Sequence, residues 1–127
     1  MIDALFSQPN YVATKKLLDV TVLRHSAIAS NLANVETPQY KRIDIAPAFE
    51  SQLRQAVKSR DPVQVAGLQP HLSVDTQAVS TRRDGNTVQM ESEMVRLSQN
   101  TVEHALETQL ISASLLRLRL AISGRNS

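Results

Sequence analysis

Apolar residues recur at helical spacing in the first third of the chain. They form one broad face, which comprises Leu17, Leu18, Val20, Val22, Leu23, Ala27, Ile28, Ala29 and Leu32. Pro38 has no amide hydrogen and its ring pushes Thr37 out of the α region, so the helix must end near Glu36. We therefore predict a helix over residues 11–36 with Asn10 as its N-cap, preceded by a flexible segment over residues 1–10.

A second, longer apolar pattern fills the C-terminal third. The four-three spacing typical of a coiled coil runs through Met90, Met94, Leu97, Thr101, His104, Thr108, Ile111, Leu115, Leu118 and Ile122. Further apolar residues widen this stripe: Val95, Val102, Ala105, Leu110, Leu116 and Leu120. We predict a helix over residues 87–123, ended by Gly124. A partner helix of about 25 residues cannot cover it, so we expect some of its apolar surface to contact other subunits.

The stretch between the two helices has no sustained hydrophobic period. Prolines at positions 38, 47, 62 and 70 interrupt it. Residues 49–58 fit a short helix, and residues 71–75 and 87–89 fit short strands around a turn at 83–86. The predicted fold is mainly α. The terminal helices pair as an antiparallel coiled-coil-like hairpin that forms one core domain, and residues 37–86 form an irregular middle segment in which short strands can occur.

Composition supports this interpretation and limits the possible chemistry. Two Phe, two Tyr, no Trp and three Gly in 127 residues suit helix–helix seams better than a β-sandwich. The absence of Cys excludes disulfides and thiolate metal sites, and it suits a protein that works outside the reducing cytoplasm. The first ten residues lack the basic and apolar regions of a cleavable secretion signal.

Candidate catalytic, metal and nucleic-acid sites are weak. His25, His71 and His104 lack the spacing of metal ligands, and no nucleophile elbow or phosphate-binding glycine loop is present. We predict no enzymatic activity, no cofactor, no metal site and no small-molecule substrate. The basic pairs 15–16, 41–42 and 82–83 are isolated, and with a net charge of +2 they are interpreted as solvated surface charge rather than a nucleic-acid site.

Two asparagines near the end of the first helix are unusual, because Asn lowers helix propensity. Asn34 is explained as a terminator of the helix, since Asn tolerates the left-handed conformation and competes for backbone hydrogen bonds. Asn31 lies almost one turn earlier and has no such local reason. Because polar groups at helix interfaces can set register and partner choice, we predict an intersubunit contact at Asn31.

The run from residue 23 to residue 41 resembles the N-terminal signature of bacterial flagellar rod and hook proteins. That signature reads close to I-A-x-N-[IL]-A-N-x-x-T-P-G-Y, and Asn31, Asn34, Thr37, Pro38 and Tyr40 match it position by position. Gln39 replaces the usual glycine, which raises the question of how the backbone turns at that position. The short length, the turn at 84–86 before residues 90–94 and the terminus near Ile122 resemble a proximal rod subunit in particular.

The resemblance implies a structural subunit that polymerises through its terminal helices into the proximal rod and transmits torque. It also implies export through the flagellar type III apparatus without a cleaved signal, and a location in the periplasmic rod of the basal body. The implied partners are other rod subunits, the membrane-ring protein and its rod adaptor, and further copies of the chain in a helical assembly. The predicted subunit-interface residues are Asn31, Leu32, Asn34, Thr37, Pro38, Tyr40, Met94, Leu97, Ile111, Leu115, Leu118 and Ile122.

Two other classes fit the same residues. One is a different axial subunit of the rod or hook, which keeps the mechanism and changes the position. The other is a soluble coiled-coil adaptor or chaperone that stays in the cytoplasm.

Overall fold

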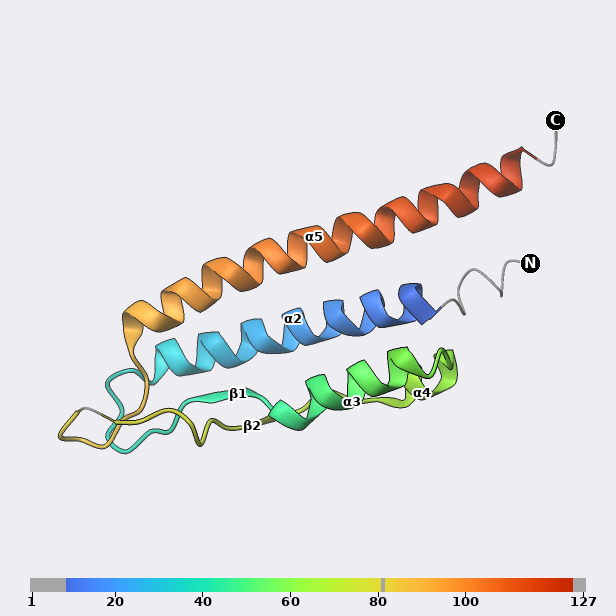
Figure 1. Cartoon of the computed structure of the whole chain (residues 1–127). Coiled ribbons are helices and arrows are strands. Elements are labelled where there is room, and N and C mark those ends of the chain that lie inside the picture. The colour runs from blue at the N-terminus through green and yellow to red at the C-terminus, as the bar shows by residue number, and fades with distance from the viewer. Residues whose placement is uncertain (1–8, 81, 125–127) are drawn as a thin grey trace.

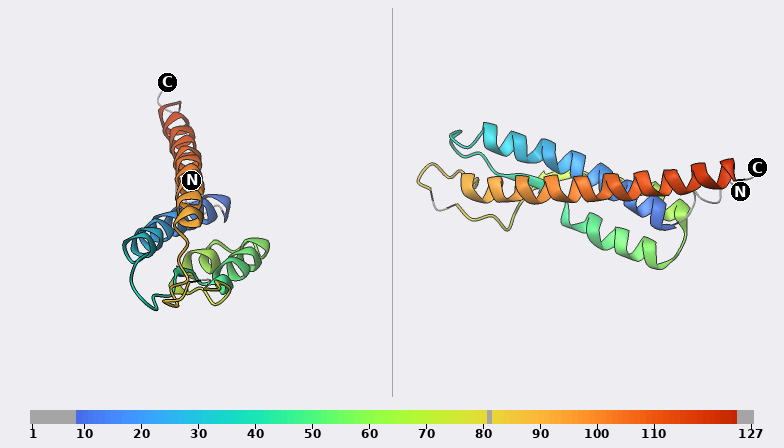
Figure 2. Two further views of the ribbon diagram at one scale, coloured as in Figure 1. Left: turned by 90° about the vertical axis from the view of Figure 1, so that its left-hand side faces the viewer. Right: turned by 90° about the horizontal axis from the view of Figure 1, so that it is seen from above.

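A computed structural model of the protein describes residues 9–80 and 82–124. Helix α2 (Pro9–Ala33) lies at the centre, and helix α5 (Met90–Ser123) runs antiparallel to it along one side (Figures 1 and 2). The middle segment lies along the other side of α2. It consists of strand β1 (Ile43–Ile45), helix α3 (Pro47–Lys58), helix α4 (Pro62–Gly67) and strand β2 (Leu72–Val74). The predicted mainly helical fold with paired terminal helices is confirmed.

The apolar core lies between α2 and the middle segment. Its buried members are Val20, Ile45, Phe49, Leu53, Ala56 and Val65. Phe49, Leu53 and Ala56 are spaced at three and four residues, which places them on one face of α3. Burial of this face stabilises the monomer, since apolar area removed from water is the dominant favourable contribution to folding.

The middle segment contains more regular structure than the sequence predicts. The helix expected over residues 49–58 forms and begins two residues earlier, at Pro47. A second helix, α4, begins at Pro62, and the Asp61 carboxylate accepts a hydrogen bond from the Val63 N–H at its start. These two prolines therefore start helices instead of interrupting the chain, because a proline in the first turn of a helix loses no hydrogen bond and has a suitable φ.

The strand pairing also differs from the expected hairpin. Strand β2 forms within residues 71–75 as predicted, but residues 87–89 are not a strand. Strand β2 instead pairs antiparallel with β1, with Ile43 opposite Val74 and Ile45 opposite Leu72. The pairing joins segments about thirty residues apart, and local turn signals do not reveal such a partner.

The helix limits differ slightly from the prediction. Helix α2 ends at Ala33 and a turn carries the chain toward Pro38, so the helix does not reach Glu36. Asn10 lies inside the helix rather than at its N-cap, because α2 already includes Pro9. Residues 1–8 of the predicted flexible segment lie outside the described residues. Helix α5 starts at Met90, three residues later than predicted.

Candidate assembly interface

The residues of α5 that are most deeply buried against α2 are polar. Its buried residues are Glu93, Asn100 and Glu107, which lie seven residues apart and are 0%, 3% and 9% exposed. The Asn100 amide donates a hydrogen bond of 2.8 Å to the Thr21 carbonyl oxygen. A Glu107 carboxylate oxygen and the His104 Nδ1 each lie 3.2 Å from the Thr21 hydroxyl. The two helices are therefore joined partly by hydrogen bonds, at positions where apolar residues are usual.

One of the two predicted heptad rows of α5 does not face α2. Leu97, Ile111 and Leu118 are half-buried and share a face with the polar row. Met94, Leu115 and Ile122 are 50%, 43% and 44% exposed. A coiled-coil heptad has two core positions, called a and d. The a positions here are Glu93, Asn100 and Glu107, each one residue before the predicted Met94, Thr101 and Thr108. The spacing was correct, but the a row of the seam is polar.

The opposite side of α5 carries an apolar row that faces solvent. We call it the back row: Val95, Val102, Leu106, Leu110, Leu116 and Leu120. At about 100° per residue these positions lie on average nearly half a turn away from the buried polar row. Their exposed fractions run from 50% to 68%. The expectation that this helix has more apolar surface than α2 covers is confirmed.

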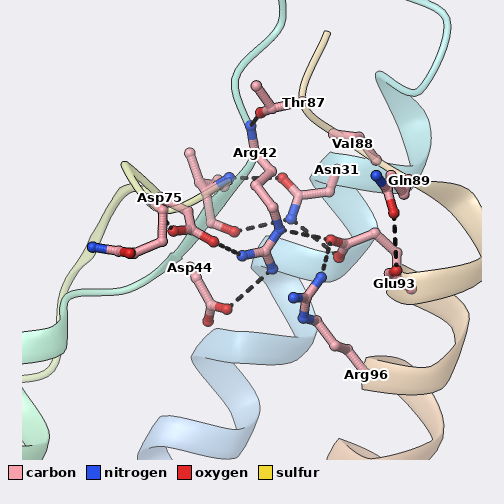
Figure 3. Close-up of polar contacts among 12 residues, drawn as sticks. Asn31, Arg42, Asp44, Asp75, Thr87, Val88, Gln89, Glu93 and Arg96 are labelled. Carbon is pink, nitrogen blue, oxygen red and sulfur yellow. Dashed lines mark hydrogen bonds and ion pairs between the residues drawn. The ribbon is translucent and has the colours of Figure 1, made fainter. Parts of the chain in front are cut away.

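A buried ionic cluster joins the middle segment to the start of α5 (Figure 3). Arg42 is 3% exposed, and its Nε donates to Glu93 at 2.7 Å while its Nη2 donates to Asp44 at 3.0 Å. The Arg42 Nη1 donates to Asp75. Arg96, from the next turn of α5, also donates to Glu93, at 3.1 Å. Three segments distant in the sequence thus meet at one guanidinium group.

The charges in this cluster stabilise one another. Burial by itself would lower the pKa of Arg42, but its hydrogen bonds to Glu93, Asp75 and Asp44 raise that pKa well above the usual arginine value. Burial would raise the pKa of Asp75, and the Arg42 hydrogen bond, together with the Gln77 N–H, lowers it below the usual aspartate value. The sequence-based interpretation of Arg42 as solvated surface charge is wrong. The neighbouring Lys41 is exposed as expected.

Asn31 has an intrachain function that sequence reasoning missed. It is fully buried, and its side-chain amide pairs with both backbone groups of Ile43 at 2.9 Å. It thus occupies the edge of β1 in the way that a neighbouring strand would. Its Nδ2 also lies 3.2 Å from Glu93, and its Oδ1 accepts from the Tyr40 hydroxyl at 3.2 Å. These contacts supply the local reason that the sequence lacked, so an intersubunit role for Asn31 stays a prediction.

The turn after α2 is held by a network of side chains. Asn34 donates to the Ser30 carbonyl oxygen at 2.8 Å, which confirms that its side chain bonds the backbone at the helix end. Asn34 is not left-handed, however, and that conformation falls on Gln39 instead. Asn86, which sequence reasoning did not single out, is 1% exposed and donates to the carbonyl oxygens of Asn34, Val35 and Thr37. Thr37 donates to Asn34 at 3.1 Å. The signature residues therefore shape this turn within the monomer.

The remaining signature positions differ in exposure. Thr37 and Pro38 are exposed, whereas Leu32, Asn34 and Tyr40 are half-buried. Gln39 has a φ of +61°, so the backbone adopts the left-handed conformation that glycine favours. The question raised by Gln39 is thereby answered. The turn keeps its shape although the residue is not glycine, and the Gln39 N–H donates to the Asp84 carbonyl oxygen at 2.8 Å.

Metal sites, pockets and membrane-spanning helices are the other features that would bear on function in residues 9–80 and 82–124. No group of three His, Asp or Glu side chains among them is placed to hold a metal ion. His25 and His104 line a small pocket of about 300 Å³ between α2 and α5, together with Thr21, Val22, Asn100 and Thr101. None of the described helices is both long enough and apolar enough to cross a membrane.

A helix that is polar toward its own chain and apolar toward solvent is typical of a subunit whose outer surface is covered in an assembly. The comparisons with known proteins agree. The chain is 32% identical over 111 residues to the flagellar basal body rod protein FlgB of Borreliella burgdorferi, which covers 73% of this chain and 80% of that protein. It is 30% identical over 109 residues to FlgB of Cereibacter sphaeroides, which covers 80% of this chain and 84% of that protein. No family model matches the chain.

The chain belongs to the FlgB family of flagellar basal body rod proteins. It is a structural subunit of the flagellar basal body and assembles with other rod components. The resemblance to the rod and hook signature is confirmed.

Proposed function

We propose that this chain polymerises through α2 and α5 into the proximal rod, where it transmits torque as a structural part without catalytic activity. The observation that carries the proposal is the exposed back row of α5. These apolar side chains are 50% to 68% exposed, so an assembly in which neighbouring subunits cover them is stabilised by their burial. Repeated contacts between different surfaces of identical subunits generate a helical assembly, which is the geometry that a rod requires.

The finer parts of the proposal follow from family membership. The chain is exported through the flagellar type III apparatus without a cleaved signal peptide and functions in the periplasm. It contacts the membrane-ring protein and the rod adaptor at one end, and further rod subunits at the other.

The proposed subunit interface has two parts. On α5 it combines the back row with the exposed flank residues Met94, Leu115 and Ile122. Beside the turn it includes the exposed Thr37 and Pro38. The half-buried interface candidates Leu32, Asn34, Tyr40, Leu97, Ile111 and Leu118 pack partly within the monomer and present only their outer atoms.

A charge placed in the back row tests the proposal. Leu106 is 57% exposed, so Leu106→Asp leaves the monomer folded but places a carboxylate where a neighbouring subunit packs. We expect motility, and the amount of chain in purified basal bodies, to fall at least about tenfold in cells that express only this variant. The matched control is Gln52→Asp, which adds the same charge to an exposed position of α3, away from the back row and the flank residues of α5.

Fractionation of the same cells distinguishes the alternatives. A rod subunit copurifies with basal bodies, whereas an adaptor or chaperone stays in the cytoplasm. Wild-type incorporation of Leu106→Asp would contradict the proposed interface. Absence of the wild-type chain from basal bodies would contradict the proposed function itself.

A further inference from the structure

The buried polar row of α5 carries an inference that rests on the proposed function and deepens it. We propose that Asn100 and Glu107, together with Glu93, orient α5 so that its back row stays free for neighbouring subunits. These three residues act as positioning residues that set the rotation of α5 about its axis. Their contribution to the stability of the monomer is less important than this role.

Each member of the row has a hydrogen-bond partner outside α5. Glu93 receives hydrogen bonds from Asn31 and Arg42, at 3.2 Å and 2.7 Å. Asn100 donates to the Thr21 carbonyl oxygen, and Glu107 lies against the Thr21 hydroxyl. These contacts repeat along the helix at the same face and fail together if α5 turns about its axis. Polar groups at a positions are well suited to fixing one arrangement of paired helices.

The composition of the row does not favour maximal stability. The Asn100 Oδ1 is buried and has no hydrogen-bond partner among the described residues. Burial raises the pKa of Glu107 above its usual value, although the Thr21 hydroxyl opposes that change. Buried polar groups that are incompletely paired cost stability, and apolar residues of similar volume in their place are often neutral or stabilising.

The alternative arrangement explains why such a row is needed. If α5 turned by about half a turn, Val102, Leu106 and Leu110 would face α2 and the polar row would face water. The hydrophobic effect favours this arrangement in an isolated chain. It would also leave the subunit with a polar outer surface that neighbouring subunits could not use. The polar contacts with α2 and Arg42 oppose it.

The test replaces the two row members outside the ionic cluster, in the variant Asn100→Leu/Glu107→Leu. Because the chain has no Cys, a single Leu106→Cys substitution reports the rotation of α5 by its rate of thiol labelling. In the purified monomer we expect the double Leu variant to melt at least about 4 °C higher. We expect labelling of Cys at position 106 to slow at least about tenfold. In cells we expect incorporation into basal bodies to fall by at least the same factor.

The control is Glu107→Gln, which keeps the shape and the hydrogen-bonding capacity and should label and incorporate like the wild type. Incorporation of the double Leu variant at the wild-type level, unchanged thiol labelling, or a lower melting temperature would each overturn the inference. Failure of the proposed function is seen separately, as absence of the wild-type chain from basal bodies, and it leaves the monomer measurements valid.

Discussion

Helix α2 is held on its two sides by different chemistry. Toward the middle segment it buries Val20 against Phe49, Leu53 and Val65, an apolar core that depends on shape and area. Toward α5 it offers Thr21 and Asn31 to a buried polar row. The first contact stabilises the monomer by apolar burial, and the second adds directional hydrogen bonds that fix the register and rotation of α5. The longest described helix, α5, fully buries only polar residues, and most of its large apolar side chains stay exposed.

The largest expected effect comes from the apolar side. Phe49 is 1% exposed, so Phe49→Ala should lower the free energy of unfolding by about 3–5 kcal/mol, measured by urea denaturation of the purified monomer. The matched substitution in the back row is Leu106→Ala, which should change that free energy by less than about 0.5 kcal/mol. Similar losses from the two variants would remove the distinction between the two sides of α2.

The ionic cluster should have the next largest effect. Glu93→Gln keeps the side-chain shape but weakens the hydrogen bonds from Arg42, Arg96 and Asn31. Because hydrogen bonds to charged groups are stronger than neutral ones, we expect a loss of about 2–3 kcal/mol in the same denaturation measurement. The control Glu91→Gln lies in the same first turn but is exposed, and it should stay near the wild type. Equal effects would show that helix-terminal charge, rather than the cluster, is responsible.

A smaller, stabilising effect is expected at the turn. Gln39 has a φ of +61°, which costs about 1–2 kcal/mol in a residue with a Cβ atom. Glycine removes that cost but adds about 0.5–1 kcal/mol of backbone entropy to the unfolded chain, so Gln39→Gly should gain about 0.5–1 kcal/mol. Gln69→Gly, at an exposed coil position without positive φ, should lose stability, and urea denaturation of both variants measures the difference. A loss at both positions would contradict the left-handed turn.

The smallest effect is a pH dependence of the polar seam. The raised pKa of Glu107 means that the folded state binds a proton more tightly than the unfolded state does. Relative to Glu107→Gln, the wild type should therefore gain stability as the pH falls from neutrality through that raised pKa. The gain should level off below the ordinary glutamate pKa. Denaturation of both proteins across this range measures the difference, and parallel curves would mean that burial does not affect Glu107.

Some features of the fold and the site could be predicted directly from the chain. The two terminal helices, the stop before Pro38, the helix within residues 49–58 and the excess of apolar surface on α5 follow from local spacing and backbone chemistry. The signature residues 31–40 are a contiguous pattern, and they indicate a rod protein by themselves. Other features were missed because they depend on partners far along the chain. Arg42 meets Asp75 and Glu93, and Asn86 meets the carbonyl groups after α2.

The seven-residue interval between Glu93, Asn100 and Glu107 is visible in the sequence, but apolar periodicity directs attention to the neighbouring positions. The amino-acid sequence by itself determined the two terminal helices, their approximate lengths and the family, because these depend on period, proline placement and a contiguous signature. Only the tertiary structure decided which face of α5 turns inward. That choice depends on hydrogen bonds to Thr21, Asn31 and Arg42, whose positions in space are set by the packing of the rest of the chain.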